Sequence, residues 1–546
     1  MKKAFWVLTG LVSVALMLVG CSGNTDGSDI SGKENYGFNQ TGYPIVSKPI
    51  TLRAVVKKNV LHDDWGKTYW AEWAEKKSGI KIEYEHIDKQ AWDQKKQIMF
   101  AANELPDIFM GGFNGITQVE EVVYGDNNGM LIPLNDLIEK YAPNIKETYQ
   151  KYPFVKAGTT TPSGNIYSLP KLSFAVNNVK RIWINQQWLN NLGMEKPETV
   201  EQMREVLFAF RDKDPDKNGI NDTYGTSGCF LEYEADMRFL WLRAYGFLTD
   251  SFNIKNGNIV YTPYEVNFKE YLAEMNYLFK EGLIDKSYFT QSPTDFKAKS
   301  SLVKVGVASW SSPSASGGMT EKSQTEQYTY VKPLTSKVNS TPIWDKAYSS
   351  SVTGGNFVIT EVNKYPEASI RWADMWFTEE GGIVKDIGPE KGSFGKDTEV
   401  GYYFLDDGTY KVKYPDDVKD TWAYYNANFA PAEDGCNFGL QPKMMELGNG
   451  RNQGLLYELG MAMLDYGKNS PVTQMPNFYF DKESQEKLAV IKTEVESYAR
   501  QMEAKFITGD EPLSNFEKYR ETLRKYGVEK LIDTYQEAYK EYVKNL

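Results

Sequence analysis

Residues 164–225 read GNIYSLPKLSFAVNNVKRIWINQQWLNNLGMEKPETVEQMREVLFAFRDKDPDKNGINDTYG. The stretch opens with a turn and a short run that ends at Pro170, and a β-rich run, VKRIWIN, follows at residues 179–185. A helix is predicted to begin after Thr199, because Thr199 and Gln202 have the spacing of a reciprocal N-terminal cap. One apolar stripe supports this helix and consists of Val200, Met203, Leu207 and Phe210. We therefore expect a strand crossing that leads into an amphipathic helix.

The same stretch ends in a loop in which oxygen-bearing side chains alternate and Gly219 occupies the sixth position. Calcium takes several oxygen ligands with flexible geometry, and alternate residues of a tight loop can converge on one ion. The expected ligands are Asp214, Asp216, Asn218, the carbonyl of Ile220, and Asp222. Position twelve is Gly225, whereas a complete EF-hand loop has a bidentate glutamate there. The alternative is a turn without metal, because Asp, Asn, Gly and Pro favour turns on their own.

Size and charge narrow the class of protein. The chain has 546 residues, too many for one ordinary core, which indicates about two to four folding units. Hydrophobic residues make up 41% and charged residues 25% of the chain, as in soluble globular proteins. The formal net charge of -11 argues against a nucleic-acid-binding protein, whose affinity would rest on clustered Lys and Arg.

The N-terminus has the pattern of a lipoprotein export signal. Two lysines precede an apolar run, and LVGC at residues 18–21 resembles a bacterial lipobox, whose cysteine is diacylated. We expect residues 1–20 to be a signal peptide, Cys21 to carry the lipid, and residues 21–48 to be a flexible tether rich in Gly, Ser and Asn. The alternatives are an uncleaved anchor and a plain secretory signal. The mature protein is thus expected on the extracellular face of the cell membrane.

Cysteine and histidine are scarce in the mature chain. Cys229 and Cys436 allow at most one disulfide, and we expect two buried, unpaired thiols instead. A catalytic cysteine normally needs a histidine base, and His62 and His86 are far from both cysteines in the sequence.

The mature chain begins with alternating strands and helices. Runs rich in β-branched and apolar residues predict strands at 50–56, 80–84 and 106–110, and amphipathic runs predict helices at 69–78 and 92–102. This alternation indicates a parallel sheet covered by helices. Because ligands bind beyond the carboxyl ends of such strands, the loops after the first and third strands are expected at the functional edge.

Together these features resemble the bacterial extracellular solute-binding proteins, and specifically the large carbohydrate-importing lipoproteins of family 1. The motifs that carry the resemblance are LVGC at 18–21, LPDI at 105–108, GNIYSLP at 164–170, INQQWL at 184–189, LG to PET at 192–199, the loop at 214–222, and FITG to YQEAY at 506–539. The resemblance covers almost the whole mature chain. It implies an α/β fold of the two-lobed, type II periplasmic-binding-protein kind, with hinge strands, a cleft and extra C-terminal helices.

The resemblance also implies where the lobes lie. The first lobe would hold residues 49–172 plus about 350–400, and the second would hold residues 175–345 plus much of 400–546. The loop at 214–222 resembles the calcium loop of large family members, so a structural Ca²⁺ is implied. The acidic pair that usually closes the family's loop is Asp222-Thr223 here, so one carboxylate is missing.

The function implied by the resemblance is capture of an oligosaccharide in the cleft and its delivery, by a monomer, to the permease subunits of an ABC transporter. A sugar offers a C–H face and a rim of hydroxyls, so its site needs aromatic plates and polar side chains. The residues that meet this need on loops expected at the cleft are Trp310, Trp65 and Phe394 for stacking, and Asn114, Asn177 and Asn178 for hydrogen bonding.

Two other classes of function stay open. An extracellular carbohydrate-active enzyme would need two carboxylates at a set distance in the cleft, and with 73 Asp and Glu residues such a pair can always be nominated. The sequence has no Gly-x-Ser-x-Gly elbow followed by a usable histidine, no His-Glu-x-x-His and no phosphate loop. A peptide-binding or sensor lipoprotein of the same fold is the third class. We expect a binding protein and not an enzyme.

Overall fold

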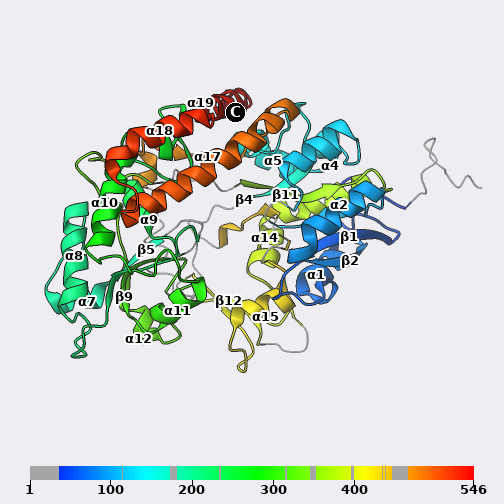
Figure 1. Cartoon of the computed structure of the whole chain (residues 1–546). Helices are drawn as coiled ribbons and strands as arrows, with labels where there is room; N and C mark the ends of the chain where they lie inside the picture. The colour runs from blue at the N-terminus through cyan, green and yellow to red at the C-terminus, as the bar shows by residue number, and fades with distance from the viewer. Residues whose placement is uncertain are drawn as a thin grey trace, which may run out of the picture.

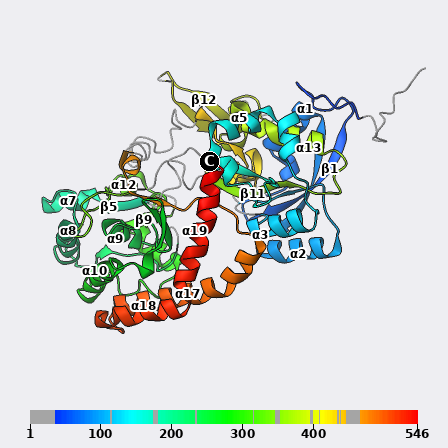
Figure 2. The same cartoon turned by 90° about the horizontal axis from the view of Figure 1, so that it is seen from above.

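The computed structural model shows two α/β lobes side by side, with three C-terminal helices running along one side of the pair (Figures 1 and 2). The structure describes residues 36–112, 115–172, 181–232, 235–313, 316–344, 352–394, 399–406, 408–432, 435–436, 438–444 and 465–546. The predicted signal peptide and Cys21 lie outside these residues. Within them, no helix combines the length and the apolar character that a membrane span requires.

The first lobe is built on a six-stranded sheet in the order β14-β4-β11-β3-β1-β2. The strands are β1 Ile50–Lys58, β2 Ile80–Asp88, β3 Ile108–Met110, β4 Ser168–Leu172, β11 Val352–Ile359 and β14 Gly439–Leu440. β1 is parallel to β2 and β3, whereas β11 is antiparallel to β3 and β4. The predicted parallel start of the sheet is therefore confirmed.

Helices cover this sheet. They are α1 Tyr69–Ser78, α2 Trp92–Ala102, α4 Asn135–Tyr141, α5 Pro143–Lys151, α6 Pro153–Ala157, α13 Pro366–Asp374 and α14 Glu379–Asp386. Thr68 accepts a hydrogen bond from Ala71 at the start of α1, and Gly79 ends the helix with a left-handed φ of 76°. These local signals explain why α1 has the predicted bounds.

The second lobe has a four-stranded sheet in the order β10-β5-β9-β6. Its strands are β5 Arg181–Asn185, β6 Tyr224–Thr226, β9 Val305–Trp310 and β10 Tyr328–Tyr330, and its helices are α7 Gln186–Leu192, α8 Val200–Asp212, α9 Arg238–Ala244, α10 Phe268–Lys280, α11 Pro293–Ser301 and α12 Lys322–Thr325. The capping box of Thr199 and Gln202 is present at the start of α8. The predicted apolar stripe of α8 is buried in the core of this lobe.

The C-terminal helices belong to the core of the second lobe. They are α17 Lys482–Thr508, α18 Phe516–Lys525 and α19 Val528–Lys544, and they follow a small sheet of β7 Phe252–Lys255, β8 Asn258–Tyr261 and β15 Val472–Gln474. A buried ion cluster ties α17 to α9, because Arg238 pairs with Asp236 at 2.6 Å and with Glu503 of α17 at 2.7 Å. In Figure 2, the start of α17 lies beside α3 Gln118–Glu120 of the first lobe.

The described residues between 399 and 444 lie in the first lobe, whereas the sequence prediction placed much of 400–546 in the second. The elements in this region are β12 Gly401–Phe404, β13 Tyr410–Lys413, α15 Thr421–Tyr424 and the π-helix η7 Tyr425–Phe429. Phe429 and Phe438 are buried in the same core cluster as Leu52, and β14 extends the six-stranded sheet. Only the later part of the predicted region, from β15 onward, packs in the second lobe.

Residues 36–48, which the sequence analysis assigned to the tether, also pack on the first lobe. Ile45 is fully buried, and its backbone N–H donates to the carbonyl of Ser78 at 2.8 Å. The rings of Tyr36 and Tyr365 meet edge to face with centroids 4.8 Å apart. This part of the prediction is wrong, because sparse apolar residues in a polar segment still found partners in the core.

Candidate functional site

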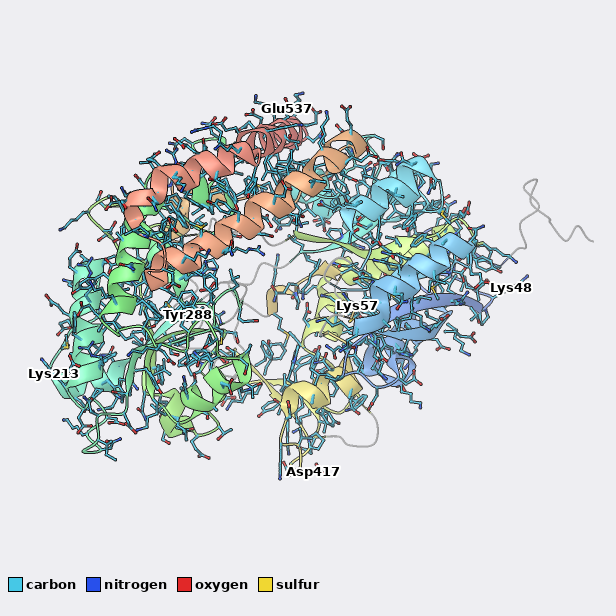
Figure 3. All side chains as sticks on the ribbon, viewed as in Figure 1. Lys48, Lys57, Lys213, Tyr288, Asp417 and Glu537 are labelled. Atoms are coloured by element: carbon cyan, nitrogen blue, oxygen red, sulfur yellow. The ribbon has the colours of Figure 1, made fainter. Side chains whose placement is uncertain are left out.

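The carboxyl ends of β1 and β3 meet at one edge of the first lobe, as predicted for parallel neighbours. Lys57, near the end of β1, is buried, and its ammonium group donates to the carbonyl oxygen of Gly112 in the loop after β3. Figure 3 shows Lys57 on the side of the first lobe that faces the second, with Tyr288 across from it in the second lobe. At this edge the first lobe faces the second.

Trp65 follows β1, but its side chain belongs to the core. The ring is fully buried, its Nε1–H donates to His62 Nδ1 at 3.3 Å, and it meets Trp70 edge to face with centroids 6.2 Å apart. Asp64 caps the short 3-10 helix η1 Trp65–Lys67 by accepting a hydrogen bond from the N–H of Gly66. The prediction of a sugar-stacking role for Trp65 therefore needs correction, since neither face of the ring is available to a ligand in this structure.

Trp310 is the last residue of β9 and is also buried, with 1% of its surface exposed. Its ring lies against Phe296 and Tyr328, with centroids 6.3 Å and 5.1 Å away. Arg181 pairs with Trp310 in the sheet. Alternation along the strand turns the indole onto a covered face, so the expected stacking role is not supported by its position.

Phe394 keeps a partly exposed ring in the first lobe. Its centroid lies 5.9 Å from that of Tyr69 and 5.3 Å from that of Phe429, both edge to face. Of the predicted stacking residues it is the one that still offers surface. Asn114, Asn177 and Asn178 lie outside the described residues.

An exposed tryptophan that stacks on a buried tyrosine in the same lobe was missed by the sequence analysis. Trp422 of α15 is 42% exposed and stacks on Tyr425, with an interplanar angle of 11° and centroids 5.6 Å apart. Asp420 caps α15 through the N–H groups of Trp422 and Ala423 and so fixes the indole. The run WAYYNANF at 422–429 could have been noticed for its aromatic density.

A buried carboxyl group lies where the two lobes join. Glu121, at the start of the π-helix η3 Glu121–Asn127, has its oxygens 2.8 Å from the hydroxyl of Ser168 in β4 and 2.9 Å from the hydroxyl of Tyr479. The N–H of Gly355, at an irregularity in β11, donates to the same Ser168 hydroxyl. Burial raises the pKa of Glu121 to about 8, although the bonds from Ser168 and Tyr479 act to lower it.

The cluster of Glu121, Ser168, Gly355 and Tyr479 contains residues from the segments that link the lobes. β4 precedes the passage to β5 of the second lobe, and β11 follows the passage back from β10. The segment that leads from β15 to α17 then returns to the first lobe, where the Asn477 amide donates to the carbonyl of Val352 at 2.6 Å. Glu121 is therefore in contact, directly or through Ser168, with all three linking segments.

The loop predicted to bind calcium has a tightly bent backbone. Asp214 accepts hydrogen bonds from the N–H groups of Asn218 at 3.1 Å and Gly219 at 3.0 Å. Gly219 has a left-handed φ of 83°, which a glycine adopts without strain. The N–H of Ile220 donates to the Asn218 side-chain oxygen at 2.7 Å. The bend that the sequence predicted is present.

Donor groups, however, contact the oxygens that calcium would use. The Lys304 ammonium lies 2.7 Å from Asp222 and 3.2 Å from Asp216, and the Asn218 amide N–H donates to Asp216 at 2.9 Å. The Thr223 hydroxyl donates a hydrogen bond to the carbonyl of Phe210 and not to a group of the loop. Within the described part of the chain, no three acidic, histidine or cysteine side chains are gathered closely enough to hold a metal ion. In this conformation the loop does not fit calcium.

The two cysteines are free and buried in different core clusters, as expected. Burial raises the pKa of Cys229 to about 11 and that of Cys436 to about 12. Both thiols are therefore protonated near neutral pH and are poor nucleophiles.

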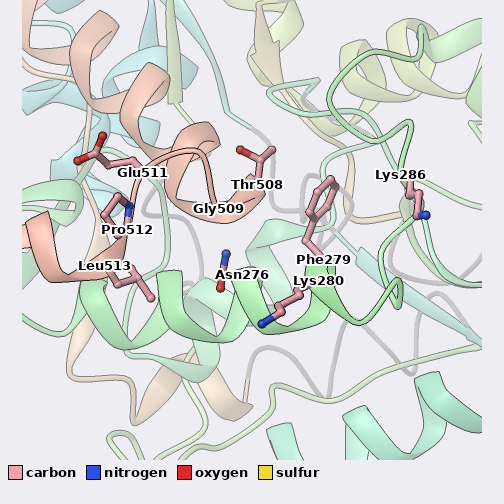
Figure 4. Close-up of a pocket in the computed structure, with 9 residues that line it drawn as sticks. All are labelled: Asn276, Phe279, Lys280, Lys286, Thr508, Gly509, Glu511, Pro512 and Leu513. Atoms are coloured by element: carbon pink, nitrogen blue, oxygen red, sulfur yellow. The ribbon is translucent and has the colours of Figure 1, made fainter.

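One pocket of about 610 Å³ lies away from the edge between the lobes, between α10 and the turn that joins α17 to α18 (Figure 4). The Asn276 amide faces into this turn and donates to the carbonyls of Phe506 at 3.0 Å and Ile507 at 3.2 Å, so it caps the end of α17. The polar side chain at the centre of this pocket thus has a structural role.

Comparison with known protein families identifies the chain. Residues 59–383 match the family model described as "Bacterial extracellular solute-binding protein", which covers more than half of the chain. The chain belongs to this family of solute-binding proteins.

Other members of the solute-binding family align with nearly the whole chain. The fructooligosaccharide ABC transporter substrate-binding protein FusA of Streptococcus pneumoniae is 26% identical over 508 residues, which are 86% of each chain. An extracellular solute-binding protein of Bifidobacterium longum subsp. infantis has a TM-score of 0.76 at 22% identity, over 91% of this chain and 99% of that one. An EF-hand mutant of S. pneumoniae FusA in complex with fructo-nystose has a TM-score of 0.69 at 23% identity, over 91% and 100% of the two chains. The two structures confirm the two-lobed fold.

Proposed function

We propose that this solute-binding protein captures an oligosaccharide between its lobes and delivers it to the permease subunits of an ABC transporter. The observation that carries the proposal is the alignment with the fructooligosaccharide-binding FusA along 86% of both chains. The two-lobed architecture supports the proposal, because a ligand bound between two lobes can contact both of them when they close. Such a ligand favours the closed arrangement by as much as it binds that arrangement more tightly than the open one. The chemistry is binding, without turnover of the sugar.

The ligand would meet the edge formed by the ends of β1 and β3. Phe394 and Trp422 offer exposed aromatic surface for the C–H face of a sugar ring, and Lys57 lies on the side that faces the other lobe. Asn114, Asn177 and Asn178 stay proposed hydrogen-bonding residues. Because Trp65 and Trp310 are buried, we assign them to the core in this proposal.

Lipidation of Cys21 would hold the protein at the extracellular face of the membrane. Two acyl chains on one cysteine anchor a soluble domain stably, whereas a single chain does not. Packing of residues 36–48 on the first lobe shortens the proposed tether to about residues 22–35. We propose that the anchored protein acts as a monomer.

We also propose that calcium can bind at residues 214–222 in a structural role. The alternation of Asp214, Asp216, Asn218 and Asp222 supports the proposal, and so does the existence of an EF-hand mutant of FusA among the similar structures. Calcium would require the Lys304 ammonium and the Asn218 amide to turn away first.

A panel of ligands in a thermal-shift assay tests the function. A ligand that binds only the folded state raises the melting temperature, so we expect a response to oligosaccharides and none to peptides. Chromatography of the same mixtures would reveal shortened glycans if the protein were an enzyme. A response to peptides alone would favour the peptide-binding or sensor alternative.

A further inference from the structure

The loop at residues 214–222 holds a cation that comes from the chain itself. Lys304 is 82 residues away from Asp222 in the sequence, yet its Nζ is 2.7 Å from the Asp222 carboxylate and 3.2 Å from that of Asp216. These two carboxylates stand at the third and ninth positions of the loop, where oxygen ligands of calcium are expected. A single ammonium therefore bridges two of the predicted ligands.

The backbone holds Lys304 in this place. Its carbonyl accepts a hydrogen bond from the N–H of Tyr224 at 2.9 Å, and the next residue, Val305, pairs with Tyr224 where β9 meets β6. Val303 has a φ of 57°, a left-handed conformation that a β-branched residue adopts only at a cost. The lysine thus directly precedes a strand whose register with the end of the loop is fixed.

Other polar groups of the loop are bonded to the protein itself. The Asn218 side chain turns its N–H toward Asp216, and its oxygen accepts from the N–H of Ile220. Related loops carry a carboxylate at the position of Thr223. The Thr223 hydroxyl donates a hydrogen bond to the carbonyl of Phe210 in α8. A divalent ion would need oxygens at these points.

We propose that Lys304 is the internal counter-ion of this loop, so that the loop keeps its bend without calcium and any calcium that binds must displace the ammonium. The contact joins the loop to β9 and therefore couples its order to the sheet of the second lobe. This inference concerns the same loop as the calcium proposal. The melting temperature in EGTA tests it independently of whether the loop binds calcium.

Substitution of Lys304→Met tests the inference through the melting temperature in EGTA and in excess Ca²⁺, and through calcium titration calorimetry. In EGTA we expect K304M to melt below the unmodified protein, because Asp216 and Asp222 lose their shared partner. We expect Ca²⁺ to restore K304M and to bind it about tenfold or more tightly than the unmodified protein. Lys304→Arg keeps the charge and should resemble the unmodified protein in EGTA.

Lys213→Met is the matched control, because Lys213 is an exposed lysine directly before the loop and its removal changes the net charge by the same amount. It should leave the melting temperature in EGTA and the calcium affinity nearly unchanged. Equal melting of K304M and the unmodified protein in EGTA would overturn the inference, as would measurable calcium binding that is no tighter in K304M than in K213M, whereas no calcium binding in any variant would contradict the calcium proposal alone. Oligosaccharide binding, measured in parallel, reports on the proposed function separately.

Discussion

At the scale of single residues, Glu121 joins the linking segments through a carboxyl group that is out of contact with water. The charged groups that face it are Asp126 and Glu120, which raise its pKa further, and Tyr149 and Tyr479 lie beside it. A neutral carboxylic acid can hydrogen-bond to both Ser168 and Tyr479 without the cost of a buried charge. Its ionisation would place an uncompensated negative charge at the junction.

We predict that Glu121 makes stability fall as pH rises. Burial raises its pKa from 4.5 to about 8, so between these values the folded protein holds a proton that the unfolded chain releases. The stabilisation is complete below about pH 4.5 and is lost as pH rises through about 8. Glu121→Gln cannot ionise, and its melting temperature should fall less than that of the unmodified protein between about pH 5 and about pH 8.5.

The control for this measurement is Glu147→Gln, at an exposed position on α5. It should follow the unmodified protein across the whole pH range. Parallel curves for Glu121→Gln and the unmodified protein would show that Glu121 ionises in the folded state much as it does in the unfolded chain.

At the scale of elements, the start of α8 provides a measurable cap. The Thr199 hydroxyl accepts a hydrogen bond from the N–H of Gln202 at 3.2 Å, and the Gln202 side-chain oxygen accepts one from the N–H of Thr199 at 3.2 Å. Thr199→Ala should lower the free energy of unfolding by about 1 kcal/mol in chemical denaturation. Asn267 precedes α10 but makes no side-chain capping bond, so Asn267→Ala should cost much less. Equal losses at the two positions would argue against the cap.

A second element-scale prediction concerns the attachment of α17 to α9. Arg238 is fully buried between Asp236, Asp250 and Glu503. Arg238→Met leaves three acidic groups without their cation and should cost about 3–5 kcal/mol in free energy of unfolding. Glu503→Gln should cost less, because burial already raises the pKa of Glu503 and the amide keeps its shape. Proteolysis within α17 should accelerate in R238M; unchanged cleavage would contradict this role.

The sequence predicted well those elements whose signals are local. The cap at Thr199 and the apolar stripe of α8 depend on residues a few positions apart, so they could be read directly. The covering of Trp310 depends on Phe296 and Tyr328, which reach it only through the sheet and its helices. Burial of this kind is a property of the assembled lobe and leaves no local pattern.

Contacts between distant parts of the chain also explain why the sequence analysis did not predict Lys304 at the calcium loop or the correct boundary between the lobes. The spacing from Asp214 to Asp222 was visible, but Lys304 enters from another strand far along the chain. Residues 399–444 join the first lobe through buried aromatic residues and through β14, which has two residues. So short a strand carries too little pattern to assign it to a sheet from the sequence.

At the scale of the whole molecule, the C-terminal region contacts both lobes. They pack in the core of the second lobe, while the segment before α17 bonds to Glu121 and Val352 of the first. A groove of about 410 Å³ between α3 Gln118–Glu120 and α17 lies beside these contacts. A change in the angle between the lobes is therefore expected to alter the contacts at this junction.

Isothermal titration calorimetry of the purified protein with neutral and acidic oligosaccharides tests the central claim most directly. We predict saturable binding of at least one oligosaccharide at one site per chain, with the glycan recovered intact afterward. The heat capacity change should be negative, because apolar surface is buried when a ligand is enclosed. No saturable heat with any oligosaccharide at millimolar concentration, or recovery of cleaved glycan, would contradict the assignment of this protein as an oligosaccharide-binding component of a transporter.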